Sequence, residues 1–213
     1  MELFVVSISA IASGDISVKI SLRDGQNSAE ESFIISAQAF ADMGVCKGEC
    51  TRELYELLDR EDKIYAAYKR GMYILGFGAC SEKTLLGKLL SKGFEKESAQ
   101  SAVERIRQKG FIDDRQTAVR DAQRCVSKLW GERRIHAYLS QRGYSTDLCN
   151  DAIFELEEQG VCFDDTCVEL IRSRYLPLPD DKKEKQKLIA ALLRYGYSLS
   201  QIQSALAKIS AEE

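Results

Sequence analysis

Apolar and polar positions follow two different patterns along the chain, one in its N-terminal part and another in the remainder. Apolar and polar residues alternate in Val6–Ser9 and Ile16–Leu22, which is the period of half-buried β-strands. Ser32–Ile35 is expected to add a third strand, and Ala37–Met43 to form a short helix that stops at Gly44. A small β-rich N-terminal extension with a short helix is therefore predicted for residues 1–58.

The remainder of the chain contains an internal repeat that aligns on a glycine followed by an aromatic residue. The three copies of this pair, at spacings of 50 and 53 residues, are Gly93-Phe94, Gly143-Tyr144 and Gly196-Tyr197. Apolar residues stand four and eight positions before each glycine, and six, nine, ten and thirteen positions after it. In the first copy these positions hold Leu89, Leu85, Ala99, Ala102, Val103 and Ile106.

These spacings describe two helices joined by a tight turn at the glycine. Residues four apart before the glycine, and three, four and seven apart after it, share one face of an α-helix. A glycine suits the left-handed residue that ends the first helix, and Ser145 and Ser198 stand where the second helix needs an N-cap. The alanine nine positions after the glycine allows the two helices to approach closely.

A further helical stretch precedes each pair, so that each repeat has three helices. Its apolar residues lie within Ile64–Leu75, Ala118–Leu129 and Val168–Ile171, and a loop with two prolines at residues 177–181 interrupts the third copy. We therefore predict a mainly α fold in which three tandem three-helix repeats form an elongated, curved array after the β-rich extension. The repeats are expected at residues 59–109, 110–160 and 161–213.

Charge is unevenly distributed along the chain, whose net charge is −3. Residues 80–145 have 14 Lys and Arg against 8 Asp and Glu, whereas the segments on both sides are net acidic. A basic segment of this kind can meet nucleic-acid phosphates or an acidic protein, and it can also serve only to keep helices soluble. The candidate binding residues are Lys88, Lys92, Arg105, Arg107, Arg120, Arg124, Lys128, Arg133, Arg134 and Arg142.

The sequence has no convincing catalytic or metal-binding constellation. The GxxxxGK[ST] and GxSxG motifs are missing, and His136 is the single histidine, which leaves little for a triad or a histidine-rich metal site. Asp113-Asp114 and Asp164-Asp165 could hold magnesium, as in a nuclease, but their place after a helix-ending glycine favours capping of the next helix. We expect no catalytic residue, no metal and no cofactor.

The cysteines, His136 and Trp130 are expected to have structural roles. Seven cysteines without CxxC spacing or a secretory signal favour free thiols over disulfides or zinc. His136 occupies an apolar position of the other copies, which favours packing at the edge of the core. Trp130 is expected to close a helix junction, with a contact on a binding surface as the alternative. The longest apolar run, Leu3–Ala12, is too short to span a bilayer, so a soluble cytosolic protein is expected.

Several segments of the sequence resemble the RecX family of recombination regulators. They are Ser81–Phe94, Gly110–Asp114, Gly131–Tyr144 and, more weakly, Leu188–Leu206. The N-terminal hairpin followed by Met43–Gly48 is also similar to the extension of that family. The resemblance extends over most of the chain.

The resemblance implies three tandem three-helix modules and a protein without enzymatic activity. It implies binding to the RecA recombinase filament on single-stranded DNA, in the filament groove, with inhibition of ATP hydrolysis and strand exchange. Weak or indirect contact with single-stranded DNA, no membrane partner and a monomeric state are also expected. Two alternatives remain open: a stand-alone DNA-binding protein built on helix-turn-helix-like pairs, and a magnesium-dependent nuclease that uses the aspartate pairs.

Overall fold

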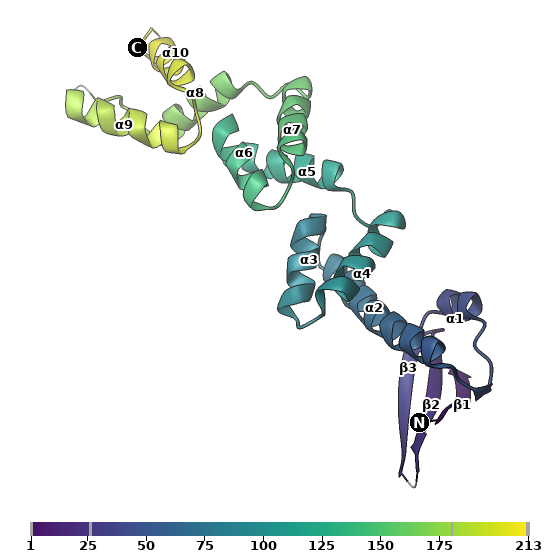
Figure 1. Cartoon of the computed structure of the whole chain (residues 1–213). Coiled ribbons are helices and arrows are strands. Elements are labelled where there is room, and N and C mark those ends of the chain that lie inside the picture. The colour runs from purple at the N-terminus through teal and green to yellow at the C-terminus, as the bar shows by residue number, and fades with distance from the viewer. Residues whose placement is uncertain (1, 26, 180, 212–213) are drawn as a thin grey trace. The chain divides into compact units, whose positions relative to one another are not determined.

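The computed structural model describes residues 2–25, 27–179 and 181–211, and the chain is mainly helical with a small sheet (Figure 1). It divides into two compact units. The first comprises Met1–Gly78 and Leu85–Phe111, and the second comprises Ala79–Thr84 and Ile112–Glu213. Across the described residues, no helix combines the length and the apolar character that a membrane span requires.

The strands that the structure describes form one antiparallel sheet in the order β3-β2-β1-β4. Their bounds are Glu2–Ala10 (β1), Ile16–Asp24 (β2), Asn27–Ile35 (β3) and Gly48–Glu49 (β4). Val18 and Ile20, two positions apart on β2, are fully buried, so the alternation places one face of the sheet in a core. The three predicted strands are confirmed, while β4 escapes prediction because two residues are too few to show alternation.

A long helix connects the sheet to the first repeat. Helix α1 (Ala37–Met43) ends at Gly44 as predicted, and α2 (Arg52–Gly76) follows after β4. Leu58, in the first half of α2, is buried in the core of the sheet, whereas Ala67, in the second half, is buried in the core of the first repeat. The expected boundary between residues 58 and 59 therefore lies inside one continuous helix that both cores share.

The repeats consist of α2–α4, α5–α7 and α8–α10, which confirms three tandem three-helix repeats. The bounds are α3 (Glu82–Ser91), α4 (Lys96–Gln108), α5 (Asp114–Val126), α6 (Glu132–Gln141), α7 (Thr146–Glu158), α8 (Phe163–Arg174), α9 (Lys182–Arg194) and α10 (Leu199–Ser210). Each glycine–aromatic pair lies between the second and third helices of its repeat. The φ angles of Gly93, Gly143 and Gly196 are +88°, +95° and +97°, the left-handed region that the missing Cβ permits.

The apolar positions that define the repeat are buried in every copy, except ten positions after the glycine, where Ile153 and Leu206 are only half-buried. The leucine four positions before each glycine is fully buried, and the alanines nine positions after it, Ala102, Ala152 and Ala205, lie in the helix contacts. Tyr144 and Tyr197, which follow the second and third glycines, are buried as well. Sequence periodicity thus identifies most of the core of each repeat.

The helix-capping serines, the proline loop and the cysteines have the roles that the sequence predicts. Ser145 and Ser198 accept backbone hydrogen bonds at the starts of α7 and α10. The proline loop separates α8 from α9, and Asp181 caps α9, while residue 180 of that loop lies outside the described residues. All seven cysteines are free thiols, as expected, and five of them are buried.

Candidate cationic interface

The predicted cations fall on both compact units. Lys88, Lys92, Arg105 and Arg107 belong to the first unit, and Arg120, Arg124, Lys128, Arg133, Arg134 and Arg142 belong to the second. Their surroundings differ, because some are committed to ion pairs inside the fold and others lie on the surface. These surroundings determine which of them are free to meet a partner.

In the first unit, two arginines are held by carboxylates of the same unit. Arg105 on α4 forms two hydrogen bonds to the buried carboxylate of Glu61 on α2, with 2.6 Å between Nη2 and Oε2. These bonds raise the pKa of Arg105 despite its partial burial. Arg107 pairs with Glu104, one turn earlier on α4, at 2.6 Å. The two lysines at the end of α3 are exposed.

In the second unit, cations and aromatic rings alternate where the start of α6 meets the turn between α9 and α10. The guanidinium carbon of Arg134 lies 4.0 Å from the ring centroid of Trp130 and 5.1 Å from that of Tyr195. The ammonium of Lys128 lies 5.4 Å from the Trp130 ring. Arg174 lies 5.6 Å from the Tyr195 ring and donates a 2.5 Å hydrogen bond to its hydroxyl. We name these five residues the cation–aromatic ladder; such contacts fix the position of cationic groups without neutralising them.

Backbone geometry at the end of α5 positions the ladder. Leu129 adopts a φ of +57°, which is rare for a residue with a side chain, and this bend leads the chain through Trp130 into α6. The backbone N–H of Gly131 donates to the carbonyl oxygen of Tyr195 at 2.8 Å. A Cβ on Gly131 would lie only 2.6 Å from the carbonyl carbon of Gly196, so glycine is needed for this approach. The first turn of α6 is thereby held against the third repeat.

Trp130 has the packing role that the sequence predicts. Trp130 is half-buried, packs against the core of the second repeat, and makes an edge-to-face contact with Tyr138 at 5.6 Å. His136 is half-buried on α6. The Trp130 ring therefore joins the apolar core of its repeat to the cations of the ladder.

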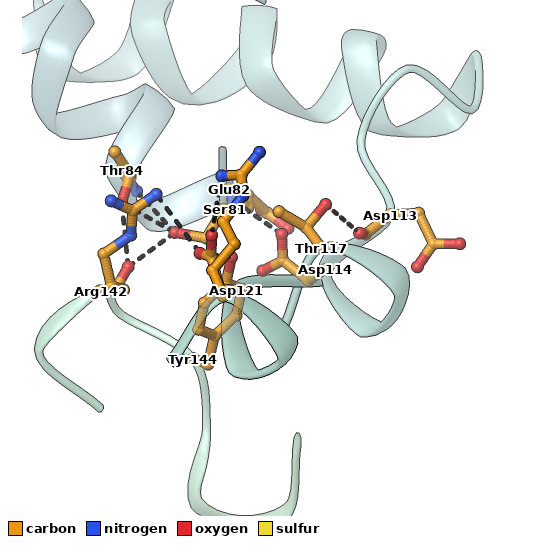
Figure 2. Close-up of polar contacts among 10 residues, drawn as sticks. Ser81, Glu82, Thr84, Asp113, Asp114, Thr117, Asp121, Arg142 and Tyr144 are labelled. Carbon is orange, nitrogen blue, oxygen red and sulfur yellow. Dashed lines mark hydrogen bonds and ion pairs between the residues drawn. The ribbon is translucent and has the colours of Figure 1, made fainter. Parts of the chain in front are cut away.

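Arg142 faces the buried carboxylate of Asp121 (Figure 2). Asp121 is only 3% exposed; it accepts a hydrogen bond from the Tyr144 hydroxyl at 3.0 Å and lies 3.3 Å from Nη2 of Arg142. Arg124 pairs with the other oxygen of this carboxylate at 3.5 Å. Burial and the neighbouring Asp121 charge raise the pKa of the Tyr144 hydroxyl. These two arginines therefore balance a buried charge.

The segment that leads into α3 is tied to the same region of the second unit (Figure 2). The hydroxyls of Ser81 and Thr84 donate to the carbonyl oxygen of Arg142 at 2.7 and 2.9 Å. The backbone N–H of Glu82 donates to the carboxylate of Asp114 at 2.9 Å. Because Ser81 is fully buried, this network has a structural role in the fold of the unit.

The aspartate pairs act at helix starts, though in different ways. Asp113 caps α5 and accepts a hydrogen bond from the backbone N–H of Gln116 at 2.9 Å, as predicted. The capping prediction is wrong for Asp164 and Asp165, because α8 begins at Phe163 and the pair lies inside its first turn, where the helix dipole favours negative charge. Among the described residues, no group of three or more His, Cys, Asp or Glu side chains is placed to hold a metal ion.

Sequence reasoning misses two members of the ladder, Arg174 and Tyr195. Arg174 lies in a net-acidic segment, so charge counting passes over it. Tyr195 occupies the position held by Lys92 and Arg142 in the other copies, immediately before the glycine of the repeat. An aromatic residue on both sides of Gly196 is the one signal that distinguishes this turn from the other two.

Known proteins of one family are similar to this chain in sequence and in fold. Residues 164–206, within the third repeat, match the family model described as RecX, third three-helix domain. A regulatory protein RecX from Xanthomonas campestris pv. campestris (strain B100) is 31% identical over 126 residues, which cover 59% of this chain and 76% of that protein. The chain belongs to the RecX family of regulatory proteins.

Two further RecX proteins extend the similarity over nearly the whole chain. The regulatory protein RecX of Caldanaerobacter subterraneus subsp. tengcongensis is 26% identical over 181 residues, 83% of this chain and 88% of its own length. The crystal structure of a regulatory protein RecX is similar to this chain with a TM-score of 0.76 at 19% identity, and the match covers 94% of this chain and 97% of the other. Because this likeness covers 94% of the chain, it extends into the N-terminal part, and membership of the family supports a regulatory role.

Proposed function

We propose that this RecX family member binds the RecA filament on single-stranded DNA and inhibits its ATP hydrolysis and strand exchange, without catalysis of its own. The observation that carries the proposal is the cation–aromatic ladder, which holds three cations in one region of the second unit. Arginine and lysine in such a setting suit the phosphates of DNA and the carboxylates of an acidic protein surface.

The predicted cations contribute unequally to the proposed interface. Exposed Lys128 lies over the Trp130 ring and Arg134 stacks on it, while exposed Arg133 lies in the first turn of α6. These three residues form the centre of the proposed interface. Arg120 and the exposed lysines of α3 add positive charge elsewhere on the surface. Arg105 acts mainly through the fold, because the buried carboxylate of Glu61 balances its charge. Arg107 is paired with Glu104 at the surface, and Arg124 and Arg142 share the single carboxylate of Asp121, which leaves one positive charge in excess there.

Tandem repeats suit a polymeric partner. Several weak contacts on one chain add through effective concentration, so that modest surface charges can produce useful affinity. A protein that binds one conformation of the filament more tightly than another shifts the filament towards that conformation. Inhibition of ATP hydrolysis then requires no catalytic residue in the RecX chain.

The experiment that tests this proposal is RecA ATP hydrolysis on single-stranded DNA, titrated with this protein. We expect hydrolysis to fall as the protein is added, and unchanged hydrolysis would contradict the proposal. Tight, strongly salt-dependent binding to DNA without any effect on RecA would instead favour a stand-alone DNA-binding protein. DNA cleavage in magnesium by the purified protein would contradict the absence of catalysis.

A further inference from the structure

Two aromatic side chains project into solvent at the end of α2, in the first unit. Tyr73 is 57% exposed and Phe77 is 78% exposed, and their rings meet edge to face at 4.9 Å. The guanidinium carbon of Arg70, one turn earlier, lies 5.0 Å from the Tyr73 ring centroid. We name these three residues the aromatic platform. Apolar rings of this size are normally buried, so their joint exposure points to a ligand.

The cation of the aromatic platform is Arg70. Of the other two cations between Lys63 and Ser81, Lys63 pairs with Asp59 at 2.9 Å and Lys69 pairs with Asp15 at 3.0 Å, so carboxylates already offset their charges. Helix α3 packs on α2 at Gly71, where a Cβ would lie 3.8 Å from Leu85, and Lys88 and Lys92 at its end add exposed positive charge to the same unit. Arg70 on the rings and these lysines on the same unit suit a polyanion.

Another exposed ring in the chain has a different setting. Phe154 on α7 is 60% exposed and lines a hollow with four carboxylates, those of Asp113, Asp151, Glu155 and Glu158, and with Arg115 and Arg120 of α5. The carboxylates outnumber the arginines there, and net negative charge repels phosphates. Phe154 is therefore a control for an exposed ring in net-acidic surroundings.

We propose that the aromatic platform stacks unpaired bases of single-stranded nucleic acid. Every base has a flat π-face, so stacking on tyrosine or phenylalanine tolerates any sequence, and an arginine over the ring adds a cation–π contact. Bases inside a duplex are already stacked on one another and do not reach the platform. The inference goes beyond the proposed function and does not rest on it, because stacking on the platform requires no RecA.

The test compares two fluorescent fifteen-nucleotide probes with equal phosphate charge, an oligothymidylate and a fully abasic strand, by anisotropy with the full-length protein. We expect the wild-type protein to bind oligothymidylate at least about tenfold more tightly than the abasic strand. Tyr73→Leu/Phe77→Leu keeps apolar side chains but should lose this preference while retaining its affinity for the abasic strand. Phe154→Leu should behave as the wild-type protein.

Three results would overturn the inference. Equal affinity of the wild-type protein for both probes, or no binding of oligothymidylate, excludes base stacking without use of any variant. A preference that persists in Tyr73→Leu/Phe77→Leu places the stacking site elsewhere. If that variant binds both probes normally but no longer inhibits RecA, the platform contacts protein. Inhibition of RecA by the wild-type protein is measured separately, so failure of the proposed function is recognised independently.

Discussion

Gly131 and Gly196 meet through their backbones in the second unit, where a Cβ on Gly131 would lie 2.6 Å from the carbonyl carbon of Gly196. The N–H of Gly131 donates to the carbonyl of Tyr195, and the N–H of Arg133 donates to that of Gly196 at 3.2 Å. Gly196 also has a positive φ, so glycine is needed there both for the left-handed backbone conformation and for the close approach of the neighbouring backbone. This contact brings Arg134 against Tyr195 and builds the ladder.

We predict that Gly196→Ala destabilises the second unit more than Gly160→Ala. Both glycines have positive φ, but a Cβ at Gly160 meets nothing within 4 Å, whereas one at Gly196 would lie 2.5 Å from the backbone nitrogen of Arg134. Gly160→Ala should cost about 1–2 kcal/mol from backbone strain alone. Overpacking should add about 1–3 kcal/mol for Gly196→Ala.

The measurement is urea unfolding followed by the fluorescence of Trp130, the single tryptophan of the chain, which lies in the second unit. Gly160→Ala is the matched control for the φ effect. Equal free energies of unfolding for the two variants would show that the backbone contact between the repeats contributes nothing to stability.

Tyr144→Phe should lower the free energy of unfolding of the second unit by about 1–2 kcal/mol. The substitution removes the hydroxyl that donates to buried Asp121, and it leaves that carboxylate with only its two arginine partners. Trp130 fluorescence during urea unfolding again provides the measurement. A variant as stable as the wild-type protein would show that the arginines alone satisfy the buried charge.

We predict that Asp15 stabilises the fold of the first unit at neutral pH and that this stabilisation is lost in acid. Burial opposes the ionised form of Asp15, but hydrogen bonds from Ser13, Tyr65 and Lys69 outweigh burial and lower its pKa below the usual 3.8. A lowered folded-state pKa stabilises the fold above the unfolded pKa, and this stabilisation is lost as the pH falls through the folded value.

The matched variant is Asp15→Asn, compared with the wild-type protein by urea unfolding monitored by circular dichroism. At pH 7 we expect the variant to be less stable by about 1–3 kcal/mol, because hydrogen bonds to a charged group are lost. The difference should shrink as the pH falls below 3.8. A difference that stays constant from pH 7 to pH 3 would show that the charge of Asp15 is immaterial.

The helices and their buried faces can be predicted from the sequence because both depend on near neighbours. Leu89, Leu139 and Leu192 stand four positions before a glycine, and all are fully buried. A period of 3.6 residues and a left-handed glycine are local properties, so three copies of one pattern suffice to define the repeat. The start of α8 shows the limit of this approach, since one residue decides whether an aspartate caps a helix or lies inside it.

The partners of the cations cannot be predicted in the same way. Arg105 and Glu61 are 44 positions apart, and Arg134 reaches Tyr195 in the next repeat, so both contacts depend on how helices pack. Charge counting treats all ten candidate cations alike, whereas the fold uses several of them to balance carboxylates. The left-handed conformation of Leu129, which leads into the ladder, also has no sequence signal, because leucine rarely adopts it.

The most direct test of the account compares two double charge reversals in the RecA ATPase assay on single-stranded DNA. Lys128→Glu/Arg133→Glu reverses two exposed cations, one beside the Trp130 ring and one in the first turn of α6, while Lys182→Glu/Lys183→Glu makes the same change of charge at the exposed start of α9. We predict that the first variant needs a roughly tenfold higher concentration for half-inhibition, and that the second inhibits as the wild-type protein does. Equal inhibition by the first variant and the wild-type protein would contradict the account.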